Sequence, residues 1–207
     1  MEKILEIPDI VVGRLPLYLR ALQNMAQNSQ QVTSSQELGE RLGISAAQIR
    51  KDLSQFGEFG EQGTGYKIEY LIQQLQSILK VDRVWDVVVV GAGDVGHALA
   101  RYQGFRNRGF RIAMVLDSDP QKIGTQIGEF MVQSIDGLAE RISNTGIKVA
   151  MLAVPANVAQ QVTEELVKAG IRAILNYAPI NISVPSGVRV QYIDPVLHLQ
   201  RMTYYMD

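Results

Sequence analysis

The chain has no cysteine, and it has only one tryptophan and two histidines among its 207 residues. The absence of cysteine excludes a thiol redox switch, a cysteine nucleophile and a thiolate metal site. Any response to redox conditions would therefore need a bound cofactor. We also expect no metal ion.

Long apolar runs are missing as well. No stretch approaches the roughly 20 apolar residues that cross a bilayer, and the first residues lack the pattern of a secretory signal. We therefore expect a cytoplasmic protein with no membrane partner.

The chain also lacks an excess of charge of either sign. Its formal net charge is -1, and residues 1–80 carry eight Lys or Arg against nine Asp or Glu. A uniformly basic nucleic-acid-binding domain is excluded, so that any contact with DNA must rest on a local cluster of cations.

The two histidines do not form a catalytic pattern. An enzyme that reduces or oxidises a small carbonyl compound needs a histidine or lysine beside the substrate as acid or base. His97 falls on the first turn of an expected helix, where it is badly placed to reach a substrate carbonyl, and His198 lies near the end of the chain. We interpret both as ordinary surface or partly buried histidines and expect no catalytic residue.

What the chain does contain is a glycine motif directly after a valine run. Residues 87–90 predict a buried strand, and the G-x-G-x-x-G pattern of a dinucleotide-binding turn follows as Gly91, Ala92, Gly93, Asp94, Val95 and Gly96. Gly91 would permit the turn, Gly93 would let the backbone approach the phosphates, and Gly96 would let the helix pack closely. The free N–H groups at the helix start would face a pyrophosphate. The alternative is a glycine-rich turn without a ligand.

An acidic residue completes the motif. The strand-like run at 112–116 ends at Asp117, roughly 20 residues beyond the glycines, where a carboxylate binds the ribose hydroxyls of NAD. Such a carboxylate would repel a 2′-phosphate, which favours NAD over NADP.

The remaining pattern beyond residue 84 alternates strands and helices, which predicts an α/β domain with a doubly wound parallel sheet. Further strand-like runs cover 149–154, 173–175 and 188–193, and helical stretches cover 95–102, 135–143 and 157–169. Two strand ends fall on the rim where ligands bind: Ala153, Val154 and Pro155 on one, and Asn176, Tyr177, Ala178 and Pro179 on the other. Each could equally be a plain turn.

The first 80 residues predict helices instead. Apolar residues 15, 19, 22 and 25 mark one helix face, and two capping boxes start at Ser34 and Ser45. Two short helices joined by a glycine turn form a helix-turn-helix. The second would turn Gln48, Arg50, Lys51 and Ser54 outward. Residues 57–66 could form a β-wing, and 67–80 predict one more helix. A helical dimerisation module is the alternative.

Taken in order, these motifs resemble the Rex family of bacterial redox-sensing transcriptional repressors. The matching segments include RLPLY at 14–18, SSQEL at 34–38, IRKDLS at 49–54, FGEFG at 56–60, GTGY at 63–66, VGAGDVG at 90–96, YQGF at 102–105, DSDPQKIG at 117–124 and NYAP at 176–179. The resemblance covers nearly the whole chain and implies a homodimer that represses transcription at a two-fold symmetric operator. NADH and NAD+ would be its cofactors, with NADH releasing the double-stranded DNA.

The resemblance also implies three parts: a winged helix-turn-helix domain at 1–80, a Rossmann-like domain at 84–193, and a C-terminal helix at 194–207 that swaps onto the partner subunit. Candidate DNA-binding residues are Ser34, Ser35, Ser45, Gln48, Arg50, Lys51, Ser54 and Tyr66. Ser118, Lys122, Tyr102 and Phe105 join the motif residues in the expected cofactor site. Arg14 and Asp194 are candidates for an ion pair that depends on the state of the switch.

Two departures from the family pattern matter. Many relatives carry basic residues in the wing where this chain has Glu61 and Gln62, which puts wing contacts in doubt. Some relatives have a phenylalanine where Pro195 starts the last helix, so Tyr102 or Phe105 would have to form the nicotinamide wall. Two other function classes stay open on the sequence alone: an NAD-dependent oxidoreductase and a coenzyme A-binding protein.

Overall fold

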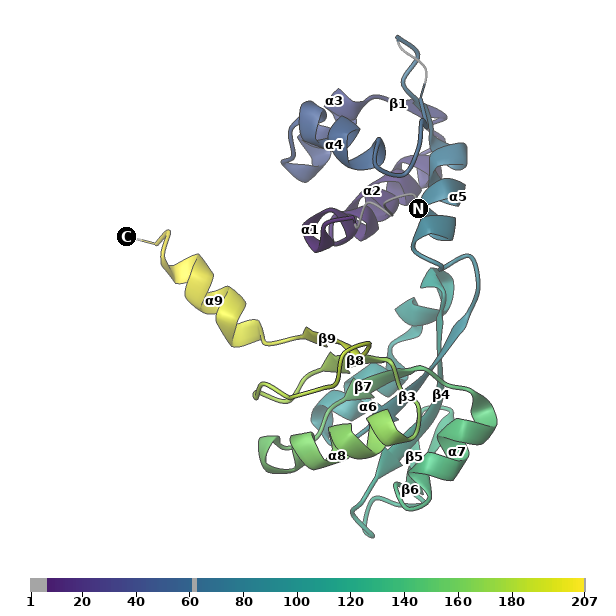
Figure 1. Ribbon diagram of the computed structural model, residues 1–207, viewed down its shortest axis with the longest axis vertical. Helices are drawn as coiled ribbons and strands as arrows, with labels where there is room; N and C mark the ends of the chain where they lie inside the picture. The colour runs from purple at the N-terminus through teal and green to yellow at the C-terminus, as the bar shows by residue number, and fades with distance from the viewer. Residues whose placement is uncertain (1–6, 61–62, 207) are drawn as a thin grey trace. The chain divides into compact units, whose positions relative to one another are not determined.

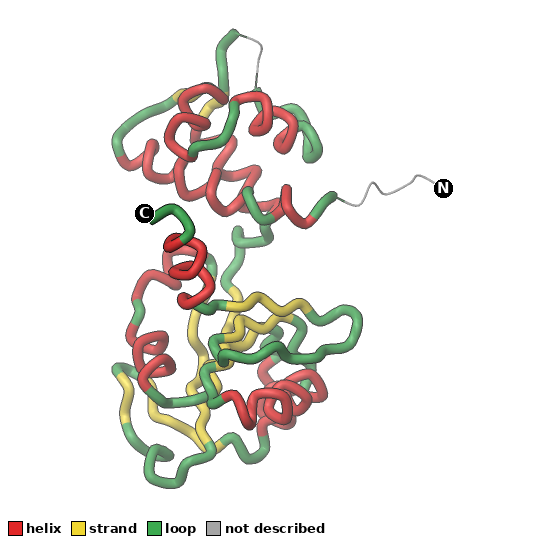
Figure 2. The backbone as a smooth tube through the Cα atoms, turned by 90° about the vertical axis from the view of Figure 1, so that its left-hand side faces the viewer, coloured by secondary structure: helices red, strands yellow, loops and turns green. Residues whose placement is uncertain are grey.

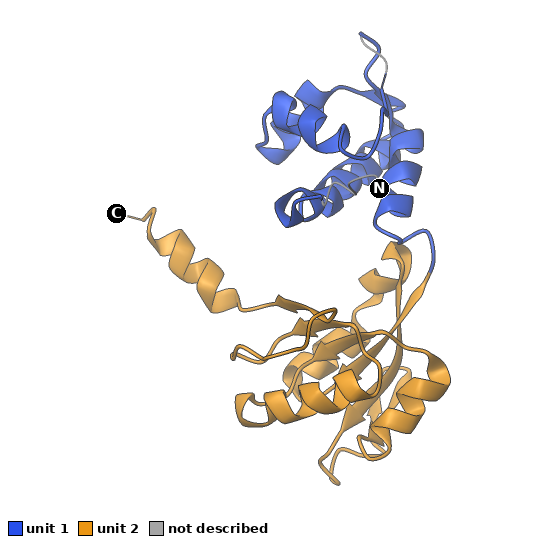
Figure 3. Ribbon diagram, viewed as in Figure 1, with its two compact units in different colours: residues 1–83 blue, residues 84–207 orange. Residues whose placement is uncertain are grey.

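The computed structural model describes residues 7–60 and 63–206, and the chain divides into two compact units, Met1–Arg83 and Val84–Asp207 (Figure 3). The doubt about contacts between the wing and DNA depends on Glu61 and Gln62, and these two residues lie outside the described residues. Unit 1 is mostly helical, whereas unit 2 is built from strands flanked by helices (Figure 2).

Unit 1 is organised around one long amphipathic helix. Its elements are α1 (Asp9–Val12), α2 (Leu15–Gln27), β1 (Val32–Thr33), α3 (Ser35–Leu42), α4 (Ala46–Leu53), β2 (Tyr66–Lys67) and α5 (Ile68–Ile78) (Figure 1). The apolar face expected on α2 is buried and packs with α5 and with the inner faces of α3 and α4. Burial of this face, rather than intrinsic propensity, holds such short helices in place.

The wing is built differently from the expectation for residues 57–66. β2 pairs antiparallel with β1, Thr33 opposite Tyr66, so the partner strand comes from before α3. Among its described residues, the stretch 57–65 contains no strand. A Cβ at Gly65 would lie 2.4 Å from the Thr33 carbonyl oxygen, which explains why glycine is needed where the two segments meet.

Unit 2 is a doubly wound sheet. Its elements are β3 (Trp85–Val90), α6 (Asp94–Arg101), the 3-10 helix η1 (Gln103–Arg108), β4 (Phe110–Asp117), β5 (Gln126–Ile127), β6 (Phe130–Ser134), α7 (Leu138–Thr145), β7 (Val149–Leu152), α8 (Ala156–Lys168), β8 (Ala173–Asn176), β9 (Arg189–Tyr192) and α9 (Pro195–Thr203). Over the described part of the chain, the strand order is β5-β6-β4-β3-β7-β8-β9. All neighbours are parallel except β5 and β6, and the six parallel strands follow the dinucleotide-binding order.

The valine run of β3 explains why helices cover both faces of this sheet. Val88 and Val90 pack in the core beneath α7 and α8, while Val87 and Val89 pack in the core that contains Ala100 of α6. Successive side chains of a strand point to opposite faces. A continuous apolar strand therefore needs a helical layer on each side.

Several expected boundaries in unit 2 are wrong, and two of the strands of this unit were missed. The helix expected at 135–143 begins only at Leu138, because Gly137 has a left-handed backbone (φ 73°) and Ser134 bonds the Asp136 N–H in a turn. The strand expected at 149–154 stops at Leu152. β5 and β6 gave no sequence signal, because β5 has two residues and β6 is only partly buried.

Candidate functional site

The glycine loop after β3 is held where side chains have no room. Gly91 has a φ of 101°, and a Cβ on it would lie 2.2 Å from the Ala153 carbonyl oxygen. A Cβ on Gly96 would lie 1.8 Å from the carbonyl oxygen of Gly91. By contrast, apart from Gly93 and its two neighbours in the chain, no described residue has an atom within 4 Å of a Cβ on Gly93. The open side of Gly93 faces a cleft, so the turn and the packing need Gly91 and Gly96, while Gly93 leaves space for a ligand.

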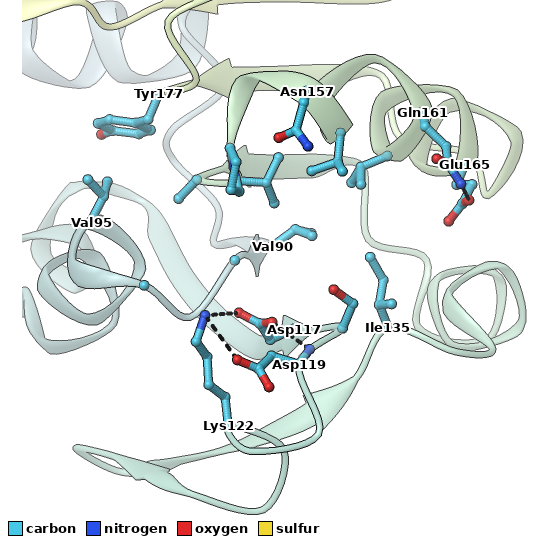
Figure 4. Close-up of a pocket in the computed structure, with 18 of the residues that line it drawn as sticks. Val90, Val95, Asp117, Asp119, Lys122, Ile135, Asn157, Gln161, Glu165 and Tyr177 are labelled. Atoms are coloured by element: carbon cyan, nitrogen blue, oxygen red, sulfur yellow. Dashed lines mark hydrogen bonds and ion pairs between the residues drawn. The ribbon is translucent and has the colours of Figure 1, made fainter.

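Main-chain hydrogen bonds join the carboxyl ends of neighbouring strands around this loop. The Gly91 N–H donates to Leu116, the Ala153 N–H to Val90, and the Tyr177 N–H to Leu152. The strand order reverses between β3 and β7, which is the position where ligands bind in such sheets. A cleft of about 860 Å³ opens there (Figure 4).

Most of the expected cofactor residues line this cleft. They are Gly91, Gly93, Asp94, Val95, Asp117, Ser118, Lys122, Ala153, Val154, Pro155, Tyr177 and Pro179. α6 begins at the cleft without a side-chain cap, so its first N–H groups are available to an anion. Tyr177 and Val95 lie at one end, and Ile135 and Glu165 lie at the other (Figure 4).

Four other expected residues support the cleft from behind. Ala92 and Gly96 are buried beneath the loop, and Ala178 is buried after β8. Asn176 is also buried; its amide donates to the carbonyl oxygens of Ala178 and Ile180 and accepts from the Ala178 N–H, which fixes the turn after β8.

Tyr102 and Phe105 are not among the described residues that line the cleft. They pack edge to face, with ring centroids 5.0 Å apart, and half of Tyr102 is exposed. Their role as a nicotinamide wall stays a prediction.

The cleft also contains residues outside the expected set of cofactor-binding residues. Asp119 and Asp136 come from the turns after β4 and β6, and Asn157, Gln161 and Glu165 come from α8. The amphipathic pattern of α8 was visible, but not which part of its polar face borders a ligand. Lys122 is the one cation among the described lining residues, against five carboxylates. This charge disfavours a ligand with an additional phosphate.

Asp117 is held by the loop that it faces. Its Oδ2 accepts from the Ala92 N–H at 2.7 Å, and its Oδ1 accepts from the Asp119 N–H at 2.8 Å. Lys122 Nζ lies 3.4 Å from Oδ2. Burial alone would raise the pKa of Asp117, but these N–H groups and Lys122 lower it below its usual range. Asp117 is therefore ionised at neutral pH. One acceptor direction of Oδ1 is left for a hydroxyl, because each carboxylate oxygen has about two.

The helix-turn-helix of unit 1 begins each helix with the expected serine. Ser34 accepts from the Glu37 N–H at 3.1 Å, and Ser45 accepts from the Gln48 N–H at 3.2 Å. The return halves of these capping boxes are replaced by other contacts. Glu37 bonds Gln30 and Thr33 and lies beside Arg41.

The outward face of α4 carries the expected cations. Arg50, Lys51 and Ser54 are exposed. Arg50 Nη1 donates to Ser35 Oγ at 2.8 Å, which connects the two helices of the motif. Tyr66 is half-buried at β2, and burial raises its pKa despite the nearby charge of Arg50.

Arg14 and Asp194 each have a partner within their own unit. Arg14 donates to Asp52 on α4 from Nε at 2.6 Å and from Nη2 at 2.7 Å. Asp194 caps α9 by accepting from the Val196 N–H at 2.9 Å. A pair between Arg14 and Asp194 stays a prediction. Asp52 was missed because an acidic residue after two cations is typical of a solvated helix face.

Among the residues that the structure describes, no group of three or more His, Asp or Glu could hold a metal ion. The helices of the described residues include none long and apolar enough to span a membrane. His97 and His198 are both exposed.

Comparisons with known proteins cover both units. Residues 6–54 match the family described as "Putative DNA-binding protein N-terminus", and residues 82–180 match "CoA binding domain". The "Redox-sensing transcriptional repressor Rex" of Roseiflexus sp. (strain RS-1) is 54% identical over 206 residues, which is 100% of this chain and 94% of the relative. The protein of that name in Chloroflexus aggregans is 49% identical, with 100% and 97% covered.

Solved structures agree with this result. The crystal structure of RSP in complex with beta-NAD+ and operator DNA matches with a TM-score of 0.92 and 35% identity, covering 97% of this chain and 93% of the other. RSP in complex with beta-NADH matches with a TM-score of 0.88 and 33% identity, covering 99% and 95%. Because several relatives are far above 30% identity over nearly their full length, the chain belongs to the Rex family, whose members are redox-sensing transcriptional repressors rather than enzymes.

Proposed function

We propose that this protein is a transcriptional repressor that binds operator DNA as a homodimer and leaves the DNA when NADH binds. One observation carries the proposal: a capped helix-turn-helix and a dinucleotide cleft lie in one chain, in the order found in a repressor solved both with NAD+ and operator DNA and with NADH. Because its target is DNA, we expect the protein to act in the cytoplasm.

The cleft fits a nicotinamide dinucleotide. The open side of Gly93 and the uncapped start of α6 would receive the pyrophosphate, and the free acceptor of Asp117 would bind a ribose hydroxyl. The nicotinamide ring distinguishes the two redox forms of the ligand, because the oxidised ring carries a positive charge that the reduced ring lacks. Coenzyme A and NADPH carry a further ribose phosphate, which the acidic lining opposes.

The DNA-binding surface would lie on α3 and α4. Arg50 and Lys51 are suited to phosphates and guanine edges, and Gln48 and Ser54 are suited to base edges. Ser34 and Ser45 already use their hydroxyl oxygens as caps, so they would contact phosphates by donating. Ser35 and Tyr66 would border this surface.

We also propose the domain limits 1–80, 84–193 and 194–207, with the last helix docked on the second copy. Pro195–Thr203 are all described, and none of them is buried. A helix of nine residues is marginal alone in water, so its apolar side chains need a partner surface.

The test starts with a pool of random DNA duplexes from which the full-length protein selects its operator. Fluorescence anisotropy of the selected duplex is then followed during titration with NADH, NAD+, NADPH and coenzyme A. We expect release by NADH and no release by NADPH or coenzyme A. A protein that binds NADH but selects no duplex would contradict the proposal, as would release by coenzyme A alone.

A further inference from the structure

A fully buried carboxylate on α4 is surrounded by four hydrogen-bond donors. Asp52 Oδ2 accepts from Arg14 Nε at 2.6 Å and from Tyr18 Oη at 2.6 Å. Asp52 Oδ1 accepts from Arg14 Nη2 at 2.7 Å and from Gln48 Nε2 at 2.7 Å. A carboxylate offers about four acceptor directions, so these donors saturate it.

This cluster joins two helices that otherwise meet through apolar side chains. Arg14 precedes the first residue of α2, Tyr18 lies in the first turn of α2, and Asp52 lies in the last turn of α4. The neighbouring contacts of Ile49 and Leu53 with the core are apolar and non-directional. A two-pronged guanidinium–carboxylate pair adds a fixed distance and angle.

The carboxylate is charged in this setting. Burial alone would raise the pKa of Asp52, but the hydrogen bonds from Arg14, Tyr18 and Gln48 lower it below its usual range. Burial also raises the pKa of Tyr18, so this phenol stays protonated and can donate. The four donors are therefore in place at neutral pH.

The charge of Asp52 decides how the Gln48 amide is turned. An ionised carboxylate only accepts, so Gln48 must point its NH2 group toward Asp52. The Gln48 carbonyl oxygen is then left to accept a hydrogen bond from outside. In the major groove, the exocyclic amino groups of adenine and cytosine are the donors that such an oxygen can read.

We propose that Asp52 is a positioning residue for operator recognition, which anchors α4 on the first turn of α2 and presents the carbonyl oxygen of Gln48 to an amino-bearing base. The inference rests on the proposed function, because it takes α4 as the recognition helix. It assigns to Asp52 no contact with DNA.

A purely stabilising role is the competing explanation. Breaking a buried pair by removing one partner destabilises a protein whatever its function. The two roles differ in what a correctly folded variant does. A stabilising residue leaves the operator affinity and base preference of folded molecules unchanged, whereas a positioning residue changes both.

The experiment uses full-length Asp52→Asn and the selected operator duplex, together with duplexes in which each symmetric base pair is replaced in turn. Circular dichroism and NADH titration give the fraction of folded, active protein. We expect Asp52→Asn to keep wild-type NADH affinity and to lose at least about tenfold in operator affinity. We also expect Asp52→Asn to discriminate less between bases at one position of the operator. That position should be the one at which the comparison variant Gln48→Ala loses its base preference.

Three further variants keep the test decisive. Arg14→Lys keeps the charge but cannot form the two-pronged pair, so we expect weaker operator binding, whereas the base preference that depends on Gln48 should be retained. This variant also tests the proposal if Asp52→Asn fails to fold. Tyr18→Phe removes one donor and should have a smaller effect. Leu71→Val, in the core on α5, is the stability control and should leave the affinity of folded molecules unchanged.

The possible outcomes distinguish a failure of the positioning role of Asp52 from a failure of the proposed repressor function. Wild-type affinity and base preference in folded Asp52→Asn would overturn the positioning role while leaving the repressor function intact. The same holds if Arg14→Lys binds the operator like the wild type. A wild-type protein that selects no duplex would overturn both.

Discussion

At the scale of single residues, Asp117 contributes to the fold of the cleft and to its charge at once. Two backbone N–H groups hold its carboxylate, one from the glycine loop and one from the turn after β4. The expected ribose contact therefore uses an oxygen that is already oriented. Lys122 offsets part of the charge without neutralising the cleft as a whole.

We predict that Asp117→Ala weakens NADH and NAD+ equally, because both contain the same ribose. The loss should be about 1.5–3 kcal/mol for each, the range for a hydrogen bond to a charged group. Calorimetric titration measures it, with Asp119→Asn as the control, since Asp119 is more exposed and lies in the same turn. Unchanged NADH affinity in Asp117→Ala, with a loss in Asp119→Asn, would move the ribose contact to Asp119.

Asp52 also predicts how stability depends on pH. Its pKa in the folded protein is lowered, so its stabilising contribution is complete above the unfolded value of about 3.9 and is lost as the pH falls through the folded value. Urea unfolding from pH 7 down to about pH 2, followed by circular dichroism, measures this effect. The wild type should lose its stability advantage over Asp52→Asn as the solution is acidified. A difference that stays constant across this range would show that the pKa of Asp52 is the same in the folded and unfolded states.

At the scale of elements, the sequence predicted those parts whose signals are local or strongly periodic. The valine run of β3, the glycine motif, the serine caps and the buried face of α2 all lie where the pattern put them. Periodicity is reliable there because each element must bury a continuous face.

The remaining elements depend on contacts that no local pattern records. β6 is an outer strand of the parallel set with alternating, partial burial, and β2 finds its partner in a segment more than 30 residues away. Asp52 looks like a surface residue until α2 supplies Arg14 and Tyr18. The polar side chains that α8 adds to the cleft, Asn157, Gln161 and Glu165, likewise need the fold of the sheet to bring them close to the glycine loop.

The exposed cations of the recognition helix α4 should contribute directly to operator binding. Replacing Arg50 and Lys51 with alanine should weaken operator binding by about 1–3 kcal/mol for each bidentate hydrogen-bond pair to a base that the substitution removes. Each phosphate that is no longer neutralised should lower the slope of affinity against salt by about one. NADH binding should not change. Anisotropy at several salt concentrations measures both effects.

The matched control removes the same charge from the other unit. Lys148 and Lys168 are exposed in unit 2, and replacing both with alanine changes the net charge by the same amount. This control should keep nearly full operator affinity. Equal losses in the two double variants would mean that general charge, and not α4, attracts the DNA.

At the scale of the whole molecule, the switch is a matter of linkage between two sites. A ligand shifts an equilibrium between two states only by its difference in affinity for them. If NADH weakens operator binding by some factor, operator DNA must weaken NADH binding by the same factor. Our hypothesis is that the neutral, reduced ring favours a closed apolar pocket that excludes the charged ring. Closure would then take the two recognition helices out of the spacing of successive major grooves, about 34 Å.

The second copy enters this linkage through α9. Val196, Leu199 and Met202 recur at helical spacing, and each is more than half exposed in the single chain. Exposed apolar stripes of this kind mark interaction sites. If α9 joins the two copies, a change of the nucleotide bound in one subunit can alter how the two subunits are arranged in the dimer.

We therefore predict that deletion of residues 195–207 shifts the protein toward monomer and removes the release of DNA by NADH. The nucleotide cleft should survive, because none of α9 belongs to the core of unit 2. Sedimentation velocity measures the first effect, anisotropy the second, and NADH titration the third. His198→Ala with Arg201→Ala, which keeps the apolar stripe, is the matched control and should remain a dimer that responds to NADH. A truncated protein that is still dimeric and still releases DNA would show that the coupling runs through another surface.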